Sequence, residues 1–407
     1  MVVGAALLVQ PAIVIEAARP VASAEARVGI TVSLTNRIED VEGAWRALEA
    51  GGVESPGQSY DFIALWVAQR GIAAADQNYV VGNLDGKPVA LLPLHRRMKN
   101  GVRVLTWFPG SHAGCYAPVA DLARLEALGP AGRKALWQAM VAQLTGADLV
   151  YLRWIPELVG GKSGLFDELG AALGVETLYR AQFTSWEECD RVQRSKSRRK
   201  HDRQQGERLE AMGAVSFEEV RNGAATREVI DTMFQQRSAR FKAQGIRDCF
   251  VRDKLTGLFH AAAATDSRID VRLHVLRLDG AIVAVRYNVV EGDRMFCLIS
   301  SMSDDEAIQN GSPGKQCLLQ VMQTVFEEGF TLFDMGGGLT DEKRHWCNVQ
   351  TPLRHHYVPL TAWGRMVLAG HQAMQKTRKA IKANKRLKAL LRAPGQLLHR
   401  VSGAKSE

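Results

Sequence analysis

Leu84-Asp-Gly-Lys-Pro-Val-Ala90 is the most informative stretch for the fold, because the chain carries a near copy, Leu278-Asp-Gly-Ala-Ile-Val-Ala284, 194 residues later. Asp-Gly between two apolar runs is a strong signal for a tight β-hairpin. A match over seven positions, five of them identical, could arise by chance, but each copy is also preceded by a helical pattern and followed by a helix and an apolar strand. The predicted strands are 79–84, 89–96 and 102–108 around the first copy, and 271–278, 282–290 and 295–302 around the second. The sequence therefore predicts an α/β protein with two similar domains in tandem, each a mixed, mostly antiparallel central sheet flanked by helices.

The composition of the 407 residues is that of a globular protein, with 46% hydrophobic and 23% charged residues. A chain of this length exceeds one ordinary core, which agrees with two domains. The six cysteines form no C-x-x-C pair and several lie in apolar runs. We therefore expect buried free thiols in a reducing compartment, the cytoplasm. No apolar run is long enough for a membrane-spanning helix.

The net charge of +9 is concentrated at the C-terminal end. Residues 365–407 hold eleven Lys/Arg and one acid, Glu407, so they carry +10 and leave −1 for residues 1–364. An imperfect apolar stripe among these cations predicts either a basic amphipathic helix in peripheral contact with anionic membrane or a solvated helix. A second basic segment, 191–208, has no interleaved aromatic residues. No nucleic-acid partner is therefore expected.

The domain boundaries follow from composition and from the repeat. Residues 1–27 are apolar and Ala-rich but lack the early Lys or Arg of a signal peptide, so we predict a disordered or wrongly assigned leader. Residues 28–180 form the predicted N-terminal domain, and residues 181–362 form the C-terminal domain. Residues 363–407 form a predicted basic helical tail.

A candidate anion site lies in the second domain, in Asn310-Gly-Ser-Pro-Gly-Lys315. Ser312 is a good N-cap residue and Pro313 suits the first position of a helix. Gly311 and Gly314 would let a ligand approach the backbone closely. The first helical turn, beginning near Lys315, would then offer free N–H groups to an anion such as a phosphate. An ordinary loop that caps a helix explains the same residues.

Phe333-Asp-Met-Gly-Gly-Gly338 follows that helix and predicts a strand ending on a carboxylate. Asp334 would lie at the carboxyl end of this strand, where ligands of α/β proteins gather. There it could accept a proton, or it could cap the amides of the glycine turn. Lys343, nine residues later, could neutralise negative charge on a substrate or stay solvated in a loop. No metal is expected, because the histidines lack metal-ligand spacing.

The second half resembles the GNAT acyltransferases of the CelD type, relatives of the FemAB-like tandem-GNAT enzymes. The resemblance rests on the Ser-Pro-Gly helix start and on the Asp334, Gly338, Lys343 and Trp346 positions, and it spans about residues 30–360. The Arg-rich segment 197–209 and the helix around Arg240 also match the family. Glu342 stands where the family commonly has Tyr, and Gly337 where Arg is common.

The resemblance implies a domain that binds acetyl-CoA or another acyl-CoA as co-substrate. Residues Gly311, Ser312, Pro313, Gly314 and Lys315 would hold the pyrophosphate of that co-substrate. It assigns catalytic roles to Asp334 and Lys343 and substrate contacts to Arg240, Gly338 and Trp346.

The resemblance further implies a cytoplasmic N- or O-acyltransferase that acts on a sugar or envelope-polysaccharide precursor by direct attack on the thioester. Two alternatives remain open. One is aminoacyl transfer from aminoacyl-tRNA, with segment 191–208 contacting the tRNA. The other is a non-catalytic assembly factor for a polysaccharide machine. Binding of acyl-CoA and the salt dependence of tRNA binding would separate the three.

Overall fold

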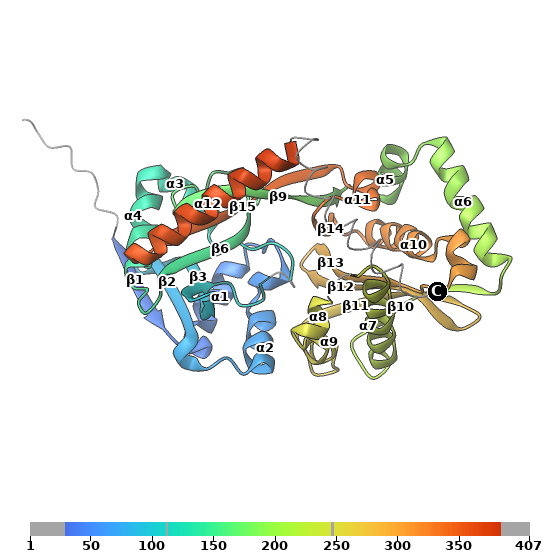
Figure 1. Ribbon diagram of the computed structural model, residues 1–407, viewed down its shortest axis with the longest axis horizontal. Helices are drawn as coiled ribbons and strands as arrows, with labels where there is room; N and C mark the ends of the chain where they lie inside the picture. Colours follow the sequence, from blue (N-terminus) through green and yellow to red (C-terminus); the bar gives the residue numbers. More distant parts are fainter. Residues whose placement is uncertain (1–28, 111–112, 246–247, 384–407) are drawn as a thin grey trace, which may run out of the picture.

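The computed structural model describes residues 29–110, 113–245 and 248–383 and shows two α/β halves side by side (Figure 1). The first half contains strands β1 (Ile30–Thr35), β2 (Gln77–Leu84), β3 (Lys87–Lys99), β4 (Val102–Thr106), β5 (Val119–Ala120) and β6 (Leu149–Pro156). Its helices are α1 (Glu42–Glu49), α2 (Tyr60–Arg70), α3 (Leu122–Ala127) and α4 (Gly129–Ala142). The short strands β7 (Leu158–Val159) and β8 (Lys162–Ser163) form a separate hairpin. The predicted leader, 1–27, lies outside the described residues.

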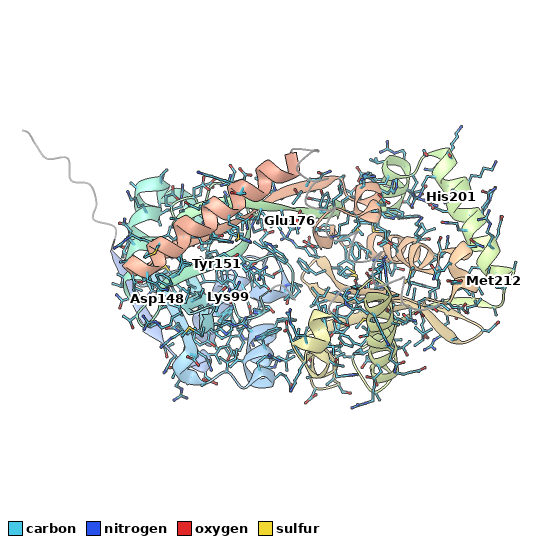
Figure 2. All side chains as sticks on the ribbon, in the orientation of Figure 1. Lys99, Asp148, Tyr151, Glu176, His201 and Met212 are labelled. Carbon is cyan, nitrogen blue, oxygen red and sulfur yellow. The ribbon has the colours of Figure 1, made fainter. Side chains whose placement is uncertain are left out.

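The second half repeats this order. Its strands are β10 (Val215–Arg221), β11 (Asp270–Leu278), β12 (Ala281–Glu291), β13 (Arg294–Met302) and β14 (Leu332–Gly337). Its helices are α5 (Trp186–Gln193), α6 (Lys196–Glu210), α7 (Thr226–Ala243), α8 (Cys249–Arg252), α9 (Thr256–Ala262), α10 (Pro313–Glu327) and α11 (Asp341–Trp346). Helix α6 forms the outer edge of this half, where Figure 2 labels His201 and Met212.

The predicted repeat is confirmed in detail. The φ angles are 50° at Asp85 and 76° at Gly86, and 47° at Asp279 and 79° at Gly280. Both Asp-Gly pairs therefore form the same tight hairpin turn. In each half an antiparallel three-stranded meander is followed by a helix and a strand that pairs in parallel with the meander's last strand, as β4 with β6 and β13 with β14. The predicted fold class is therefore correct.

The two central sheets are joined through two long strands, β9 (Ala171–Gln182) and β15 (Val349–Pro359). The order across the joint is β4-β6-β15-β9-β14-β13. Strand β15 comes from the C-terminal part of the chain but pairs with β6 of the first half, whereas β9 pairs with β14 of the second. The predicted domain boundary between residues 180 and 181 falls inside β9. The two halves exchange strands in this region, so the chain is not divided there into two separate domains.

The last described helix, α12 (Ala362–Ala383), begins at the predicted start of the tail and packs on β15. The Tyr357 hydroxyl lies 2.8 Å from Nδ1 of His371. A Cβ on Gly364 would lie 1.9 Å from the carbonyl oxygen of Asp148, so helix and sheet approach closely at this glycine. The first part of the predicted tail is therefore part of the folded body, and residues 384–407 lie outside the description. Within the described ranges, the chain has no helix with the length and apolarity needed to cross a membrane.

Candidate active site

The candidate active site is centred on the divergence of strands β13 and β14. These parallel strands pair at three positions, from Arg294 opposite Leu332 to Phe296 opposite Asp334, and the described pairing stops there. On its other side, β13 pairs with β12 through a register shift in which Leu298 is skipped. Such a bulge bends a strand and increases its twist. Beyond Phe296 the two strands therefore leave backbone edges that an extended ligand can enter.

Helix α10 begins beside this opening, and its first turn differs from the predicted cap. Pro313 is the first helical residue, as expected, but the Ser312 side chain forms no cap hydrogen bond. Instead Ser312 adopts a left-handed conformation with φ of 49°, and its hydroxyl accepts a hydrogen bond of 2.7 Å from Gln205 of α6. The amides of Lys315 and Gln316 donate to the Ser312 carbonyl. The start of α10 is thus held by α6, while the Lys315 side chain is exposed.

Gly311 and Gly314 serve packing between elements. A Cβ on Gly311 would lie 2.9 Å from the Leu209 Cβ, and one on Gly314 would lie 2.9 Å from the Met302 sulfur. Both distances are shorter than ordinary van der Waals contact, so a larger residue at Gly311 would push against α6, and one at Gly314 would displace the Met302 side chain. Both glycines are buried. The structural reason for these glycines is close helix packing, and a role in approaching a ligand stays a prediction.

Asp334 lies at the point of divergence and is held by two partners. Its Oδ2 accepts a hydrogen bond of 2.7 Å from Nε of Arg180, and its Oδ1 accepts one of 2.7 Å from the Gly336 amide. Arg180 also donates to the carboxylate of Glu54, at 2.6 Å. The three side chains are almost fully buried, with exposed fractions of 5 to 8%. Burial disfavours the guanidinium charge, but the two carboxylates hold the pKa of Arg180 above its ordinary value.

Lys343 extends from α11 back to the glycine turn that follows Asp334. Its Nζ donates to the carbonyls of Gly337, at 2.6 Å, and Gly336, at 3.3 Å. Burial lowers the pKa of Lys343, and the Asp334 charge opposes that shift. The turn requires glycine at Gly338, whose φ is +83°. Asp334, Gly338 and Lys343 are therefore brought together as predicted, although no direct Asp334–Lys343 hydrogen bond occurs in the described structure.

Arg286 is a site residue that sequence reasoning missed, and its partner Glu342 was noted only as a departure from the family pattern. Arg286 is 4% exposed, and one of its NH groups bonds Glu342, at 3.0 Å, and the carbonyl of Gly314, at 3.3 Å. It thereby ties the first turn of α10 to α11. A lone arginine within the apolar run Ala281–Val290 was the available signal. The Glu54–Arg180 pair had none, since 126 residues separate its members.

The other two predicted substrate contacts are an exposed residue and a core residue. Arg240 is exposed in the last turn of α7. Trp346 is 3% exposed and packs against Trp186, with ring centroids 6.3 Å apart. Trp346 is therefore part of the second core in this structure, and substrate contacts by Arg240 and Trp346 stay predictions.

Comparison with known proteins agrees with this geometry. Residues 196–344, which include α10, β14 and Lys343, match the family described as an acetyltransferase (GNAT) domain. The solved structure of FemX superposes with a TM-score of 0.52 at 11% identity, covering 78% of this chain and 95% of that chain. The structure of L-PGS from Bacillus licheniformis has a TM-score of 0.48 at 15% identity, covering 82% of this chain and 96% of that chain. The structure of a tandem GNAT protein from the clavulanic acid biosynthesis pathway has a TM-score of 0.42 at 9% identity, covering 81% of this chain and 98% of that chain.

A search of curated protein sequences finds no match. The sequence identity to FemX is low, so this similarity shows only that the two proteins share a fold. The shared fold covers both halves of the chain. The CelD-type assignment within the larger group stays a prediction. The family match is confined to residues 196–344, and it includes the diverging strands β13 and β14.

Proposed function

We propose that the protein is an acyl-CoA-dependent N- or O-acyltransferase whose donor lies between β13 and β14. The observation that supports this proposal is the end of parallel pairing at Phe296 and Asp334, next to the first turn of α10. The unpaired strand edges suit an extended, amide-containing chain such as the pantetheine of CoA. The positive end of the α10 dipole, together with the exposed Lys315, suits the pyrophosphate.

In the proposed reaction, an acceptor amine or hydroxyl attacks the thioester carbonyl. A C–N or C–O bond forms, the C–S bond breaks, and the thiolate leaves as the acceptor loses its proton. Lys343 would offset negative charge that develops near the glycine turn. Asp334, fixed by Arg180, would orient the acceptor or take its proton. The acceptor we propose is a sugar or envelope-polysaccharide precursor in the cytoplasm, an assignment that rests on the family resemblance.

Calorimetry with acetyl-CoA tests the donor site. Lys315→Glu places a negative charge at the start of α10 without entering the packed glycine positions, so affinity should fall at least tenfold. Gln320→Glu is the control, since Gln320 is exposed on the same helix and the variant places the same glutamate side chain away from the helix start. Absence of acetyl-CoA binding by the folded wild-type protein, or an equal loss in both variants, would overturn the proposal.

A second candidate function is aminoacyl transfer from aminoacyl-tRNA. Helix α6 favours it, because this basic helix presents exposed Lys196, Lys200 and Arg208 beside α10. Other arginines of α6 are engaged, as Arg198 is with Asp202 at 3.0 Å. This candidate predicts tRNA binding that weakens steeply with salt and that decreases in Lys196→Gln/Lys200→Gln. The acyl-CoA proposal predicts an unchanged acetyl-CoA affinity in that double variant.

A further inference from the structure

One face of the first half's sheet carries both cationic and apolar side chains. Arg97 of β3 is opposite Val104 of β4, and Val104 is opposite Leu149 of β6. Residues in register project to the same side of a sheet, and so do residues two apart along one strand. Lys99 therefore shares this face with Arg97, and Tyr151 and Arg153 share it with Leu149. Arg97 thus lies in the same row as Val104 and Leu149, and Arg153 lies four residues further along β6.

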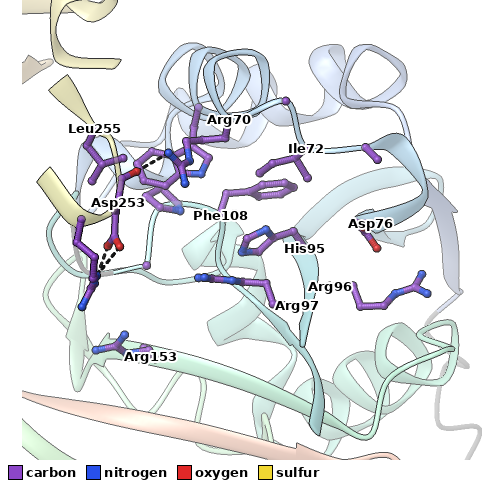
Figure 3. A pocket seen from close by; sticks show the side chains of 16 residues that line it. Arg70, Ile72, Asp76, His95, Arg96, Arg97, Phe108, Arg153, Asp253 and Leu255 are labelled. Carbon is purple, nitrogen blue, oxygen red and sulfur yellow. Dashed lines mark hydrogen bonds and ion pairs between the residues drawn. The ribbon is translucent and has the colours of Figure 1, made fainter. Parts of the chain in front are cut away.

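At the Arg153 end of this face, called the cationic end below, a cavity of about 470 Å³ lies between the two halves. Five arginines line it with two aspartates, Asp76 and Asp253; the arginines are Arg70, Arg96, Arg97, Arg153 and Arg252 (Figure 3). Arg252 pairs with Asp253, and Arg70 donates to the Asp253 carbonyl. In the described ranges, neither Arg97 nor Arg153 forms an ion pair. The lining thus carries a net charge of +3 in a concave site, which concentrates a positive potential.

Three buried polar atoms around this cavity have no hydrogen-bond partner among the described residues. They are Nε of Arg96, Nε of Arg153 and Nε2 of His95. His95 is 6% exposed and stacks on Phe108 with ring centroids 5.1 Å apart. Burial, together with the charge of Arg97, lowers the pKa of His95 to about 3, so its ring is neutral at neutral pH. Buried donors are normally satisfied, and here an acceptor-rich ligand would satisfy several at once.

Two further cavities continue from the cationic end along the same sheet face. A cavity of about 230 Å³ shares Arg97, Gly110 and Arg153 with the first. A cavity of about 420 Å³ shares Lys99, Val104 and Tyr151 with the second, and Figure 2 labels Lys99 and Tyr151 in the first half. This third cavity lies under α12 and has an apolar lining that includes Leu149, Leu368 and Met374.

We propose that this groove binds an amphipathic ligand, with a phosphate head group on the arginines and an apolar chain beneath α12. Guanidinium groups pair with phosphate oxygens in bidentate fashion, and several of them around one hollow suit a group with three or more acceptor oxygens. The apolar cavity beneath α12 would remove the chain from water. The site is distinct in its residues from the proposed donor site at α10.

A series of alkyl phosphates from butyl to decyl, used below micelle-forming concentrations, tests the groove by calorimetry. Affinity should rise about threefold to fourfold for each added methylene, until the chain fills the third cavity. Arg97→Gln and Arg153→Gln should each weaken every member of the series at least fivefold. Arg227→Gln, at an exposed arginine of α7, is the matched control and should leave the affinities unchanged. Wild-type melting temperatures in the variants establish that they fold.

A second pair of variants tests the apolar cavity beneath α12, which would hold the alkyl chain of the ligand. Met374 lines the third cavity and is 42% exposed, so Met374→Gln should fold and should flatten the dependence on chain length while leaving butyl phosphate unaffected. Met366→Gln, at a 63% exposed methionine of the same helix, should behave as wild type. Affinity independent of chain length overturns the proposal. So does a loss in Lys315→Glu without a loss in Arg153→Gln, which would place the probe at α10.

Discussion

Arg180 of β9 and Asp334 of β14 form an ion pair of 2.7 Å between residues 154 apart in the chain, at the joint of the two halves. Glu54 completes the cluster from the first half, at 2.6 Å from the same guanidinium. The strand exchange brings these three residues together, because β9 carries Arg180 out of the first half to the edge of β14. The position of the candidate active site therefore depends on the joint between the halves.

Removing the central cation of this cluster should be strongly destabilising. Arg180→Met would leave two buried carboxylates without a counter-charge, and we expect the free energy of unfolding to fall by about 3–5 kcal/mol. Urea denaturation measures this. Arg203→Met breaks an exposed pair with Glu207, in which both side chains are at least 60% exposed, and should cost less than about 1 kcal/mol. Equal losses in the two variants would contradict the structural role of Arg180.

Asp334 and Lys343 should act on one event in catalysis. Asp334→Asn and Lys343→Met should each lower kcat/KM at least tenfold, about 1.4 kcal/mol of barrier. Because both flank the same glycine turn, the double variant should lose less than the product of the two effects. Rates are compared at equal folded fraction, since Asp334 also supports the fold. Asp341→Asn, at an 81% exposed residue of α11, is the control. Strictly multiplicative losses would mean that the two residues act independently.

Glu291 should make stability fall as pH rises toward neutrality. Burial, with the nearby charges of Glu49, Asp61 and Asp270, raises its pKa to about 7. A carboxyl whose pKa is higher in the folded state binds a proton that the unfolded chain has released. Its contribution is therefore complete below pH 4.5 and is lost as pH rises to about 7, by at most about 3 kcal/mol.

Glu291→Gln should remove this dependence and raise the melting temperature at pH 8 more than at pH 5. Glu210→Gln, at an exposed position of α6, should change neither value. Melting curves between pH 4.5 and 8.5 provide the measurement. A Glu291→Gln variant that is less stable than wild type at pH 8 would show that the carboxylate is ionised and needed there.

We predict that the first part of the C-terminal segment supports the fold and that the part after Ala383 contributes to binding at anionic membranes. Since α12 packs on β15, truncation after Thr361 should lower the melting temperature. Truncation after Ala383 removes six Lys/Arg and one acid. It should keep the fold and reduce binding to anionic vesicles at low salt.

Vesicle co-sedimentation measures that binding, with neutral vesicles as the control. The exposed apolar residues Trp363, Met366 and Met374 of α12 favour such a contact. Equal vesicle binding by the full chain and the 1–383 truncation would show that the charged residues after Ala383 do not contribute to membrane binding.

The features predictable from sequence were those specified by neighbouring residues. The Asp-Gly turns, the meanders and the α10–β14 unit lie where local patterns placed them, because turn chemistry and periodicity act over short segments. Strands β9 and β15 were not predicted, since their partners are chosen by tertiary pairing. The Ser312 conformation was missed for the same reason: Gln205, more than one hundred residues away, competes for its hydroxyl.

Strand β15 has a consequence for the order in which the protein folds during synthesis. Its partner β6 ends at Pro156, and β15 begins at Val349, so the edge of β6 stays unpaired while the intervening residues are translated. At typical elongation rates that interval lasts about 10–40 s. An open strand edge on a nascent chain is a site for pairing with other chains. Completion of the first half's sheet is thus delayed until nearly the whole chain has left the ribosome, and a chaperone that covers this edge would raise the yield of folded protein.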